Sequence, residues 1–484
     1  MKVAIIVPRS TNKKQMYSEY PLGAGYIGTI IFNLGHNVKI YDQNVEYTKN
    51  EELVNEIIRF SPDLICFSIL TPTYPITLEI INILKKKNIS TPILAGGIHP
   101  TLFPIDCLNE GIDYVIKGEG EIPIEKFIYY MEGKEEIFNI PNLSYKDKNG
   151  VIVNKPNEKL DIDINKLPFI NRDLFNIKKY KMHSISGSRG CPFNCKFCCN
   201  YSHLSNIAVN KRIRSVENII EEIKYLCENY EKKDIFFTDD VFFVDINKLR
   251  RFEELIRKNN LNIRFNAQLR VNMINDEVCQ LLIKSGCKKV EVGIETGSEK
   301  ILKDVCKGIT VEDIKRGIKI CKRNNLRIKT NWIYGLPGDL EEQYKSIELM
   351  LKTKPNEISI HQLVPFPGTE YYNNREKYGI IINSCKNFKN FYYGNSDESI
   401  IYKYMSKEEY HKLIYDNTII KLEEAGYKSS DNSKNGDEYI YTTPFDKLSL
   451  QPISVKEEKE CIQLPLKDIM ELEKQQLQKH WAKD

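Results

Sequence analysis

The sequence lacks the features that would mark a membrane protein or a strongly charged one. No apolar run approaches the ~18 residues that a membrane span requires, so we expect no membrane partner. Lys and Arg number 70 against 66 Asp and Glu, which leaves a net charge of only +4. A chain so balanced has no field that would attract nucleic acid or another strongly charged partner. What remains is a chain of 484 residues, enough for two or three globular domains.

The cysteines indicate a reducing compartment. Thirteen of them are scattered through the chain, and its first residues, Lys2 to Val7, read as a β-strand rather than as a signal peptide. Cysteines outside an oxidising compartment stay reduced. We therefore expect a cytoplasmic protein.

One stretch, Gly187 to Asn200, concentrates three of the cysteines. Cys191, Cys195 and Cys198 have C-x3-C-x2-C spacing in a segment that also holds Gly, Pro and Asn. Three buried core cysteines would be the ordinary alternative, but this composition is typical of a loop. A zinc site would require a fourth Cys or His ligand nearby. Because thiolates are the preferred ligands of iron–sulfur clusters, the run predicts a [4Fe–4S] cluster with one iron open to another ligand.

Residues 2 to about 135 alternate between short β-branched apolar runs and helical patterns. This alternation predicts a doubly wound α/β sheet, Rossmann- or flavodoxin-like, with helices on both faces. Ligands of such sheets bind at the carboxyl ends of the strands. The expected strands are Val3–Val7, Val38–Tyr41, Leu64–Ile69, Ile93–Ala95 and Tyr114–Ile116, and the expected helices are Leu22–Asn33, Glu51–Phe60, Thr77–Lys87 and Ile122–Met131.

From about Met182 the strand–helix pattern restarts. Six units predict a partial (β/α)6 barrel of the TIM type, whose reactive side chains project from the carboxyl ends of the strands. The expected strands are Met182–Ser186, Asp234–Thr238, Arg264–Gln268, Lys289–Ile294, Arg327–Ile333 and Glu357–Gln362, and the expected helices are Val216–Tyr230, Ile246–Asn259, Asp276–Ser285, Val311–Asn324 and Glu341–Lys352.

These patterns divide the chain into four parts. We expect domains at residues 1–135 and 181–378, a linker at 136–180, and a mostly helical C-terminal extension at 379–484. The linker contains a predicted hairpin of Leu143–Tyr145 and Val151–Asn154. In the extension, Lys407–Glu424 and Leu466–Trp481 have helical patterns.

The cysteine run resembles the signature of radical S-adenosylmethionine (SAM) enzymes, and Phe197 stands where that family usually carries an aromatic residue. The resemblance implies that Cys191, Cys195 and Cys198 hold the cluster. It also implies that the open iron binds the amino and carboxylate groups of SAM. Reduction then cleaves SAM to a 5′-deoxyadenosyl radical.

The loops of the first domain resemble the cobalamin-binding domain that precedes many radical SAM domains. The matching runs are Pro21-Leu22-Gly23, Gly35 to Val38, Gly96 to Pro100 and Lys117 to Glu121. The D-x-H-x-x-G run that supplies a cobalt ligand in mutases is absent. The alternative is a flavodoxin-like domain that binds another nucleotide or nothing. The resemblance implies that the cobalamin-binding residues are Ser68, Thr71, Gly96, Gly97, His99, Gly118, Glu119 and Gly120.

Two runs in the barrel also match the family. Gly293 to Ser298 closely resembles G-I-E-[TS]-G-S, which implies that Glu295 meets the ribose hydroxyls of SAM and that Ser298 lies near its carboxylate. The run that starts at Tyr334 and includes Pro337 resembles the strand-five turn, whose backbone meets the adenine.

Polar residues at two further strand ends have candidate roles. The resemblance assigns Asp239 or Asp240 to the amino group of SAM, whereas an ordinary turn or helix cap is the alternative. Gln268 and Arg270 either bind the ribose or carboxylate of SAM or hold neighbouring loops.

The whole arrangement resembles cobalamin-dependent radical SAM proteins of the class B methyltransferase type. The resemblance implies that cob(I)alamin takes a methyl group from one SAM. A second SAM supplies the radical that activates an unactivated carbon, or a phosphorus, of a small-molecule or peptide substrate. An electron donor such as flavodoxin or ferredoxin is implied as a partner. Alternatives are a cyclase or ring-rearranging enzyme with the same cofactors, or a non-catalytic cobalamin or redox sensor.

Overall fold

The computed structural model describes residues 1–9, 20–46, 49–200, 211–230, 233–243, 245–382, 388, 400–429 and 439–442. These residues form one compact unit. Among them, no helix has the length and apolar character needed to cross a bilayer, and none of their cysteines forms a disulfide. The expected helix at Leu466–Trp481 lies outside the described residues. The domain limits at residues 135, 180 and 378 stay predictions.

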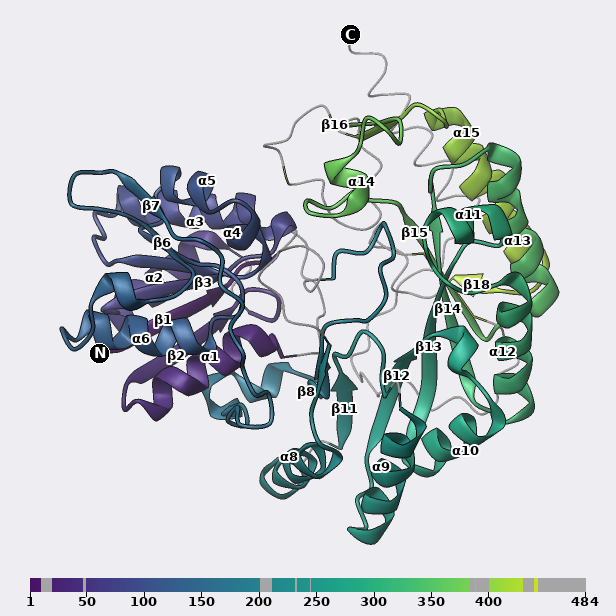
Figure 1. The fold of residues 1–484 in the computed structure, drawn as a ribbon, viewed down its shortest axis with the longest axis horizontal. Helices are drawn as coiled ribbons and strands as arrows, with labels where there is room; N and C mark the ends of the chain where they lie inside the picture. Colours follow the sequence, from purple (N-terminus) through teal and green to yellow (C-terminus); the bar gives the residue numbers. More distant parts are fainter. Residues whose placement is uncertain are drawn as a thin grey trace, which may run out of the picture. The chain divides into compact units, whose positions relative to one another are not determined.

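The first sheet has seven strands in the order β2-β1-β3-β4-β5-β6-β7 (Figure 1). The first five are parallel, as predicted, and the linker hairpin adds β6 and β7 antiparallel to its edge. The strands are β1 (Lys2–Val7), β2 (Asn37–Asp42), β3 (Leu64–Ser68), β4 (Ile93–Gly96), β5 (Tyr114–Ile116), β6 (Leu143–Lys146) and β7 (Ile152–Asn154).

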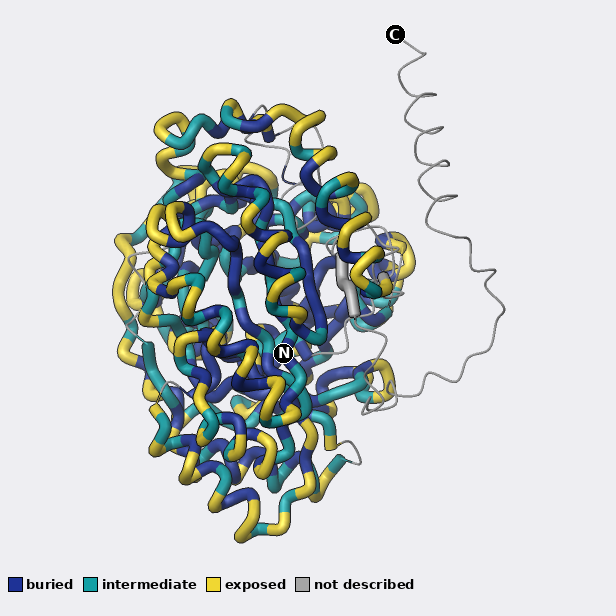
Figure 2. Tube along the Cα trace, turned by 90° about the vertical axis from the view of Figure 1, so that its right-hand side faces the viewer, coloured by how far each residue is buried: buried dark blue, intermediate teal, exposed yellow. Residues whose placement is uncertain are grey.

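Alternate side chains of β1 belong to two different cores. Ile5 packs with α1 and α6 residues on one face of the sheet, whereas Ile6 packs with α2 and α3 residues on the other. This division follows from the two-residue period of a strand. Figure 2 shows the buried strands inside and the exposed residues mostly on the outer helices. The helices are α1 (Leu22–Asn33), α2 (Asn50–Phe60), α3 (Tyr74–Lys86), α4 (Ile98–Leu102), α5 (Pro104–Asn109) and α6 (Glu121–Met131), with short 3₁₀ turns at η1 (Thr71–Thr73) and η2 (Ile137–Asn139).

The second sheet contains the six predicted parallel strands in the order β8-β11-β12-β13-β14-β15. Two strands from the C-terminal region, β19 and β18, extend it antiparallel beyond β15. The α/β class with two parallel sheets is thus confirmed. The strands are β8 (His183–Ile185), β11 (Asp234–Phe237), β12 (Arg264–Leu269), β13 (Cys287–Glu295), β14 (Arg327–Tyr334), β15 (Glu357–Gln362), β18 (Lys428–Ser429) and β19 (Tyr439–Thr442).

Side-chain caps define where the helices around this sheet begin. Ser215 accepts a hydrogen bond from the Asn218 amide at the start of α8, and Thr310 and Asp313 form a capping box at the start of α12. The sequence pattern missed the short helix α11. The helices are α8 (Val216–Asn229), α9 (Ile246–Lys258), α10 (Asp276–Lys284), α11 (Glu299–Asp304), α12 (Val311–Arg323), α13 (Leu340–Thr353) and α14 (Glu370–Asn373), with 3₁₀ turns at η3 (Arg172–Leu174), η4 (Ile177–Lys179) and η5 (Val271–Met273).

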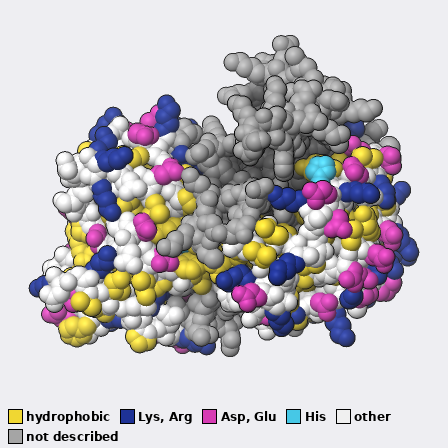
Figure 3. Space-filling view, turned by 90° about the horizontal axis from the view of Figure 1, so that it is seen from above, with side chains coloured by type: hydrophobic (Ala, Val, Ile, Leu, Met, Phe, Trp, Pro, Cys, Tyr) yellow, Lys and Arg dark blue, Asp and Glu magenta, His cyan; other side chains and the backbone are white. Residues whose placement is uncertain are grey.

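The described part of the C-terminal region contains both helices and strands. The predicted helix at 407–424 is present as α15 (Lys407–His411), the π-helical segment η7 (Lys412–Ile419) and α16 (Ile420–Glu424). The sequence pattern missed the antiparallel pair β16 (Ile380–Ile382) and β17 (Ile400–Tyr402), as well as β18 and β19. Figure 3 shows acidic and basic side chains interspersed on the described surface in that view, as the small net charge leads one to expect.

Candidate active site

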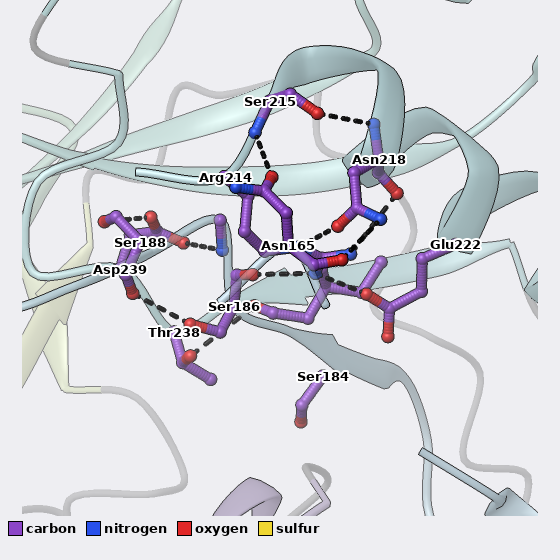
Figure 4. Close-up of polar contacts among 12 residues, drawn as sticks. Asn165, Ser184, Ser186, Ser188, Arg214, Ser215, Asn218, Glu222, Thr238 and Asp239 are labelled. Atoms are coloured by element: carbon purple, nitrogen blue, oxygen red, sulfur yellow. Dashed lines mark hydrogen bonds and ion pairs between the residues drawn. The ribbon is translucent and has the colours of Figure 1, made fainter. Parts of the chain in front are cut away.

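The cysteine loop begins directly after β8, where a buried carboxylate holds its first residues. Asp239, at the end of the neighbouring strand β11, accepts a hydrogen bond from the Gly187 amide at 2.8 Å and another from the Ser188 hydroxyl (Figure 4). Burial raises the pKa of the Asp239 carboxyl to about 6, although these two hydrogen bonds oppose the shift. The Asp239 carboxylate thus binds the start of the cysteine loop, and Asp239 does not line the cavity described below.

A second buried polar group holds the backbone just before the loop. Arg214 donates to the Ser186 carbonyl at 2.9 Å and pairs with Glu222 of α8 at 2.5 Å (Figure 4). Arg172 lies 3.6 Å from the same carboxylate and donates to the Ser184 carbonyl at 2.5 Å. Together, these contacts connect β8 firmly to the first helix of the barrel.

The far side of the cysteine loop rests on the segment that follows α11. The Lys196 amide donates to the Val305 carbonyl at 3.0 Å, and Lys307 lies 5.7 Å from the ring centroid of Phe197. The Arg270 guanidinium stacks 3.7 Å from the ring centroid of Phe193. The loop is therefore held from both sides, which places its three cysteines at the carboxyl ends of the barrel strands.

The three thiols are partly buried. Burial raises the pKa of the Cys198 thiol to about 12 and also raises that of Cys191. Among the described residues, no three His, Cys, Asp or Glu side chains converge on a single metal ion. A zinc site would need such convergence, whereas a cluster distributes its thiolate ligands over several irons. Three thiols on one loop are the donor set that a [4Fe–4S] cluster takes, so the residues present fit the predicted group. The ligand roles of Cys191, Cys195 and Cys198 stay predictions.

A cavity of about 650 Å³ opens beside this loop. Its wall combines residues from the strand ends of the first sheet with residues of the cysteine loop and the barrel. The size lies in the range of pockets that bind small ligands. The lining includes Ser68, Gly96, Gly97, Gly118, Glu119 and Gly120 from the first sheet, and Ser186, Arg189, Cys198, Cys199, Arg212 and Asp240 from the second part.

The first-sheet side of the cavity suits a flat, largely apolar ring system. Gly97 has φ +102, and a Cβ there would lie 2.7 Å from the Ile69 carbonyl oxygen, so only glycine fits. At Gly23, by contrast, no heavy atom would lie within 4 Å of an added Cβ, which leaves the cavity open. The apolar lining is contributed by Ile5, Leu22, Ile27, Leu94, Ile116 and Ile124. Cobalamin therefore fits the residues present, and none of the described residues that line the cavity is a histidine.

The predicted SAM residues are distributed between the cavity and structural contacts. Asp240 lines the cavity and accepts a hydrogen bond from Asn200. Glu295 has φ +71, a left-handed conformation that is rare for a non-glycine residue, and its carboxylate pairs with Lys307 Nζ at 2.6 Å. Strained positions of this kind cluster at active sites. Gln268 is partly buried, and its carbonyl accepts from the Phe242 amide at 2.7 Å.

Other predicted SAM residues make structural contacts. Ser298 caps α11 by accepting from the Ile301 amide at 3.1 Å, and its side chain also donates to Glu342. The Tyr334 hydroxyl lies 2.9 Å from the Thr418 hydroxyl of η7, so this side chain faces the C-terminal helix. Arg270 donates to the Lys307 carbonyl, and Pro337 lies in the turn after β14. The SAM roles of these four residues stay predictions.

Two predicted cobalamin residues are not part of the cavity lining. Thr71 is buried in η1. His99 is fully buried, packs at a tilt against Tyr74 with ring centroids 4.0 Å apart, and also contacts Phe103 and Phe388. Neither ring nitrogen of His99 has a hydrogen-bond partner among the residues that the structure describes. This position does not support contact between His99 and a cofactor.

The sequence reading missed the arginines of the cavity wall. Arg189 pairs with Glu119 and Glu121, and Arg212 also pairs with Glu119. The only sequence signal was the pair of acids in the run Gly118 to Glu121, which need counter-charges when they are buried.

The fold and the site define a protein that joins a cobalamin-binding domain to a radical SAM domain. The family described as "B12 binding domain" matches residues 14–128, and the family described as "Radical SAM superfamily" matches residues 185–350. The chain therefore belongs to the B12-binding-domain radical SAM proteins. Its cofactors are a [4Fe–4S] cluster, SAM and cobalamin.

Relatives place it beside methyltransferases. An uncharacterized methyltransferase of Pyrococcus horikoshii is 29% identical over 86% of this chain and 91% of its own length. An anaerobic magnesium-protoporphyrin IX monomethyl ester cyclase of Synechocystis is 23% identical over 73% of this chain and 72% of its own. The structure of the radical SAM methyltransferase TsrM from Kitasatospora setae is similar, with a TM-score of 0.66 and 17% sequence identity. The match covers 86% of this chain and 88% of the TsrM chain. The protein is thus a methyltransferase-like, cobalamin-dependent radical SAM enzyme.

The buried environment of His99 predicts a pH effect on stability. Burial lowers the pKa of the His99 imidazole to about 3, below its ordinary value near 6.5. Below pH 6.5 the unfolded chain binds a proton that the folded chain does not, so stability falls as the pH falls. Between about pH 7.5 and 5.5 the free energy of unfolding should therefore fall in the parent. We expect this fall to be smaller in His99→Leu than in the parent by about 1.4 kcal/mol.

Denaturant unfolding at several pH values measures this difference. Phe103→Leu is the control, because it changes packing in the same cluster without removing a titratable group. An unchanged pH dependence in His99→Leu would contradict the assignment of His99 as a buried neutral histidine.

Proposed function

We propose that this enzyme methylates an unactivated carbon, or a phosphorus, of a small-molecule or peptide substrate bound in the cavity. The single observation that carries the proposal is the shared wall of that cavity. Gly96, Gly97 and Gly118 line it from the first sheet, and Cys198 and Asp240 line it from the other side. A substrate there can reach both cofactor regions. TsrM, whose fold is similar, has tryptophan named as its substrate.

The bound cofactors supply the methyl group and the radical. The chain's own residues bind and orient them. We assign Cys191, Cys195 and Cys198 as cluster ligands, and Asp240 as the side chain that meets the amino group of SAM. Glu295 is assigned to the ribose hydroxyls, where a carboxylate can accept two hydrogen bonds. Its ion pair with Lys307 orients that carboxylate.

The loops of the first sheet provide the cobalamin site. Gly96, Gly97, Gly118 and Gly120 allow the backbone to approach the edge of a flat ring, and Ser68 offers a hydroxyl to its amide rim. An electron donor such as flavodoxin or ferredoxin, and a cytoplasmic location, complete the proposal.

The second candidate keeps the cofactors but forms a ring, as the named cyclase relative does. The two reactions differ in their by-products. Methylation consumes SAM in two ways and releases both S-adenosylhomocysteine and 5′-deoxyadenosine. Anaerobic protein reconstituted with iron, sulfide and cobalamin, then given SAM and a reductant, should release both. Release of 5′-deoxyadenosine without S-adenosylhomocysteine would favour the cyclase instead.

The adjacent cysteines Cys198 and Cys199 allow a sharp test of cluster ligation. Cys198→Ala should lose most of the about four irons per chain and lower 5′-deoxyadenosine formation at least ~100-fold. Cys199→Ala is the matched control, because Cys199 also lines the cavity but lies outside the C-x3-C-x2-C spacing. It should keep its iron content, its electron paramagnetic resonance signal and its activity. Equal losses in both variants would refute the ligand assignment.

A second test concerns Glu295. Loss of a charged hydrogen bond costs about 1.5–3 kcal/mol, so Glu295→Gln should raise the KM for SAM roughly 10- to 150-fold in the 5′-deoxyadenosine assay. Glu291→Gln is the control, since Glu291 lies on the same strand and also pairs with lysines. Its KM should change less than about threefold. A similar KM in both variants would remove Glu295 from the SAM site.

A further inference from the structure

Four charged side chains from distant parts of the chain meet on the cavity wall. Arg189 contacts Glu119 at 2.9 Å and Glu121 at 2.5 Å, and Arg212 contacts the same oxygen of Glu119 at 2.5 Å. The acids belong to the loop after β5 and the start of α6. The arginines belong to the strands β9 (Ser188–Arg189) and β10 (Arg212–Ile213) beside the cysteine loop. We call these four residues the clamp.

The clamp is largely shielded from water and balanced in charge. Its side chains are between 9% and 20% exposed, and two cations face two anions. Burial alone would lower the pKa of the Arg189 guanidinium, but Glu121 and Glu119 outweigh burial and raise it. Burial alone would raise the pKa of the Glu119 carboxyl, but Arg212 and Arg189 outweigh it and lower it. In this shielded position salt screens the attraction between the four groups only weakly.

Glu119 also resolves a conflict within the small β9–β10 sheet. Arg189 and Arg212 are direct cross-strand partners in this antiparallel pair. Like charges directly opposite each other destabilise a strand pair. Because one carboxylate oxygen of Glu119 accepts from both guanidinium groups, the acid of the first sheet makes this pairing favourable. The strand pair that includes the start of the cysteine loop thus depends on the cobalamin-side loop, residues 117–121.

The neighbours of the clamp extend the connection. The Arg189 guanidinium lies 5.2 Å from the ring centroid of Tyr26 on α1, and Arg212 donates to the Ile162 carbonyl at 3.1 Å. Along the chain, Arg189 is two residues before Cys191, and Glu119 lies between the two glycines Gly118 and Gly120. A shift of either loop would therefore be transmitted to the other.

We infer that Arg189 and Arg212 are positioning residues that set the register between the cobalamin-side loop and the cysteine loop. This inference rests on the proposed function. It assigns Glu119 to the clamp rather than to contact with cobalamin. The clamp is needed for transfer of the methyl group from SAM to reduced cobalamin. This step uses SAM and cobalamin together, and it releases S-adenosylhomocysteine. It is not needed for cobalamin binding alone or for reductive cleavage of SAM alone.

Three assays that need no substrate separate these roles in anaerobically reconstituted full-length protein. They are the affinity of cobalamin-free protein for hydroxocobalamin, the rate of 5′-deoxyadenosine formation, and the rate of S-adenosylhomocysteine formation with reduced cobalamin. For Arg212→Gln we expect about a tenfold loss in the third assay and less than about threefold changes in the first two. Arg212→Lys keeps the charge and should recover part of the loss.

The control and the double variant test the pairing itself. Arg250→Gln removes a 2.6 Å ion pair with Glu277 that joins the exposed faces of α9 and α10, away from the first sheet, and should leave all three assays unchanged. The single variants Glu119→Gln and Arg212→Gln are compared with the double variant that carries both changes. If Arg212 acts through Glu119, the double variant should form S-adenosylhomocysteine no more slowly than the slower of the two single variants. If the fold-loss in the double variant equals the product of the two single fold-losses, the two side chains act separately, and the inference is overturned.

Hydrogen–deuterium exchange of the amides at residues 117–121, with hydroxocobalamin bound, provides a readout independent of turnover. Exchange should be faster in Arg212→Gln than in Arg250→Gln. A proportional loss in all three assays, or no loss of S-adenosylhomocysteine formation, would refute the positioning role. If the parent itself forms no S-adenosylhomocysteine, the proposed function fails. The exchange data then test the positioning role of the clamp by themselves. Equal exchange in Arg212→Gln and Arg250→Gln would refute that role.

Discussion

The position of the cysteine loop depends on the carboxylate of Asp239. Strand β11 pairs in parallel with β8, so Asp239, two residues beyond the end of β11, reaches the loop that follows β8. A carboxylate buried this deeply is costly unless donors satisfy it. The Gly187 amide and the Ser188 hydroxyl provide those donors. The same two hydrogen bonds therefore stabilise the buried charge and fix where the loop begins.

The two sheets contribute different kinds of side chain to the wall of one cavity. The first sheet presents glycines and aliphatic side chains at its carboxyl edge, which suits a large flat ligand. The barrel side presents thiols, arginines and Asp240, which suits a charged cluster and a charged cofactor. Ser68 and Gly96 of the first set and Asp240 of the second lie at or just beyond carboxyl ends of parallel strands, where α/β folds bind their ligands. Chemistry that uses two cofactors requires such a shared edge.

Local patterns predicted a large part of this arrangement. The helices at 22–33 and 216–229 and all six parallel barrel strands lie within a few residues of the expected ranges, because periodicity and capping are local properties. The cavity lining also includes the expected Ser68, Gly97 and Cys198. The orientation of single side chains was less predictable. Ser298 caps a helix and His99 packs among aromatic rings, because the neighbours of a side chain come from remote segments.

The sequence by itself determined the two strand–helix alternations, the cysteine spacing and hence the class of chemistry, since each is written in residues close together along the chain. Only the tertiary structure decided that β18 and β19 extend the barrel sheet, that Tyr334 faces η7, and that Glu119 lies between Arg189 and Arg212. Those contacts join residues separated by about 70 to 90 positions. Such pairings follow from how whole elements pack, and no local pattern of residues encodes them.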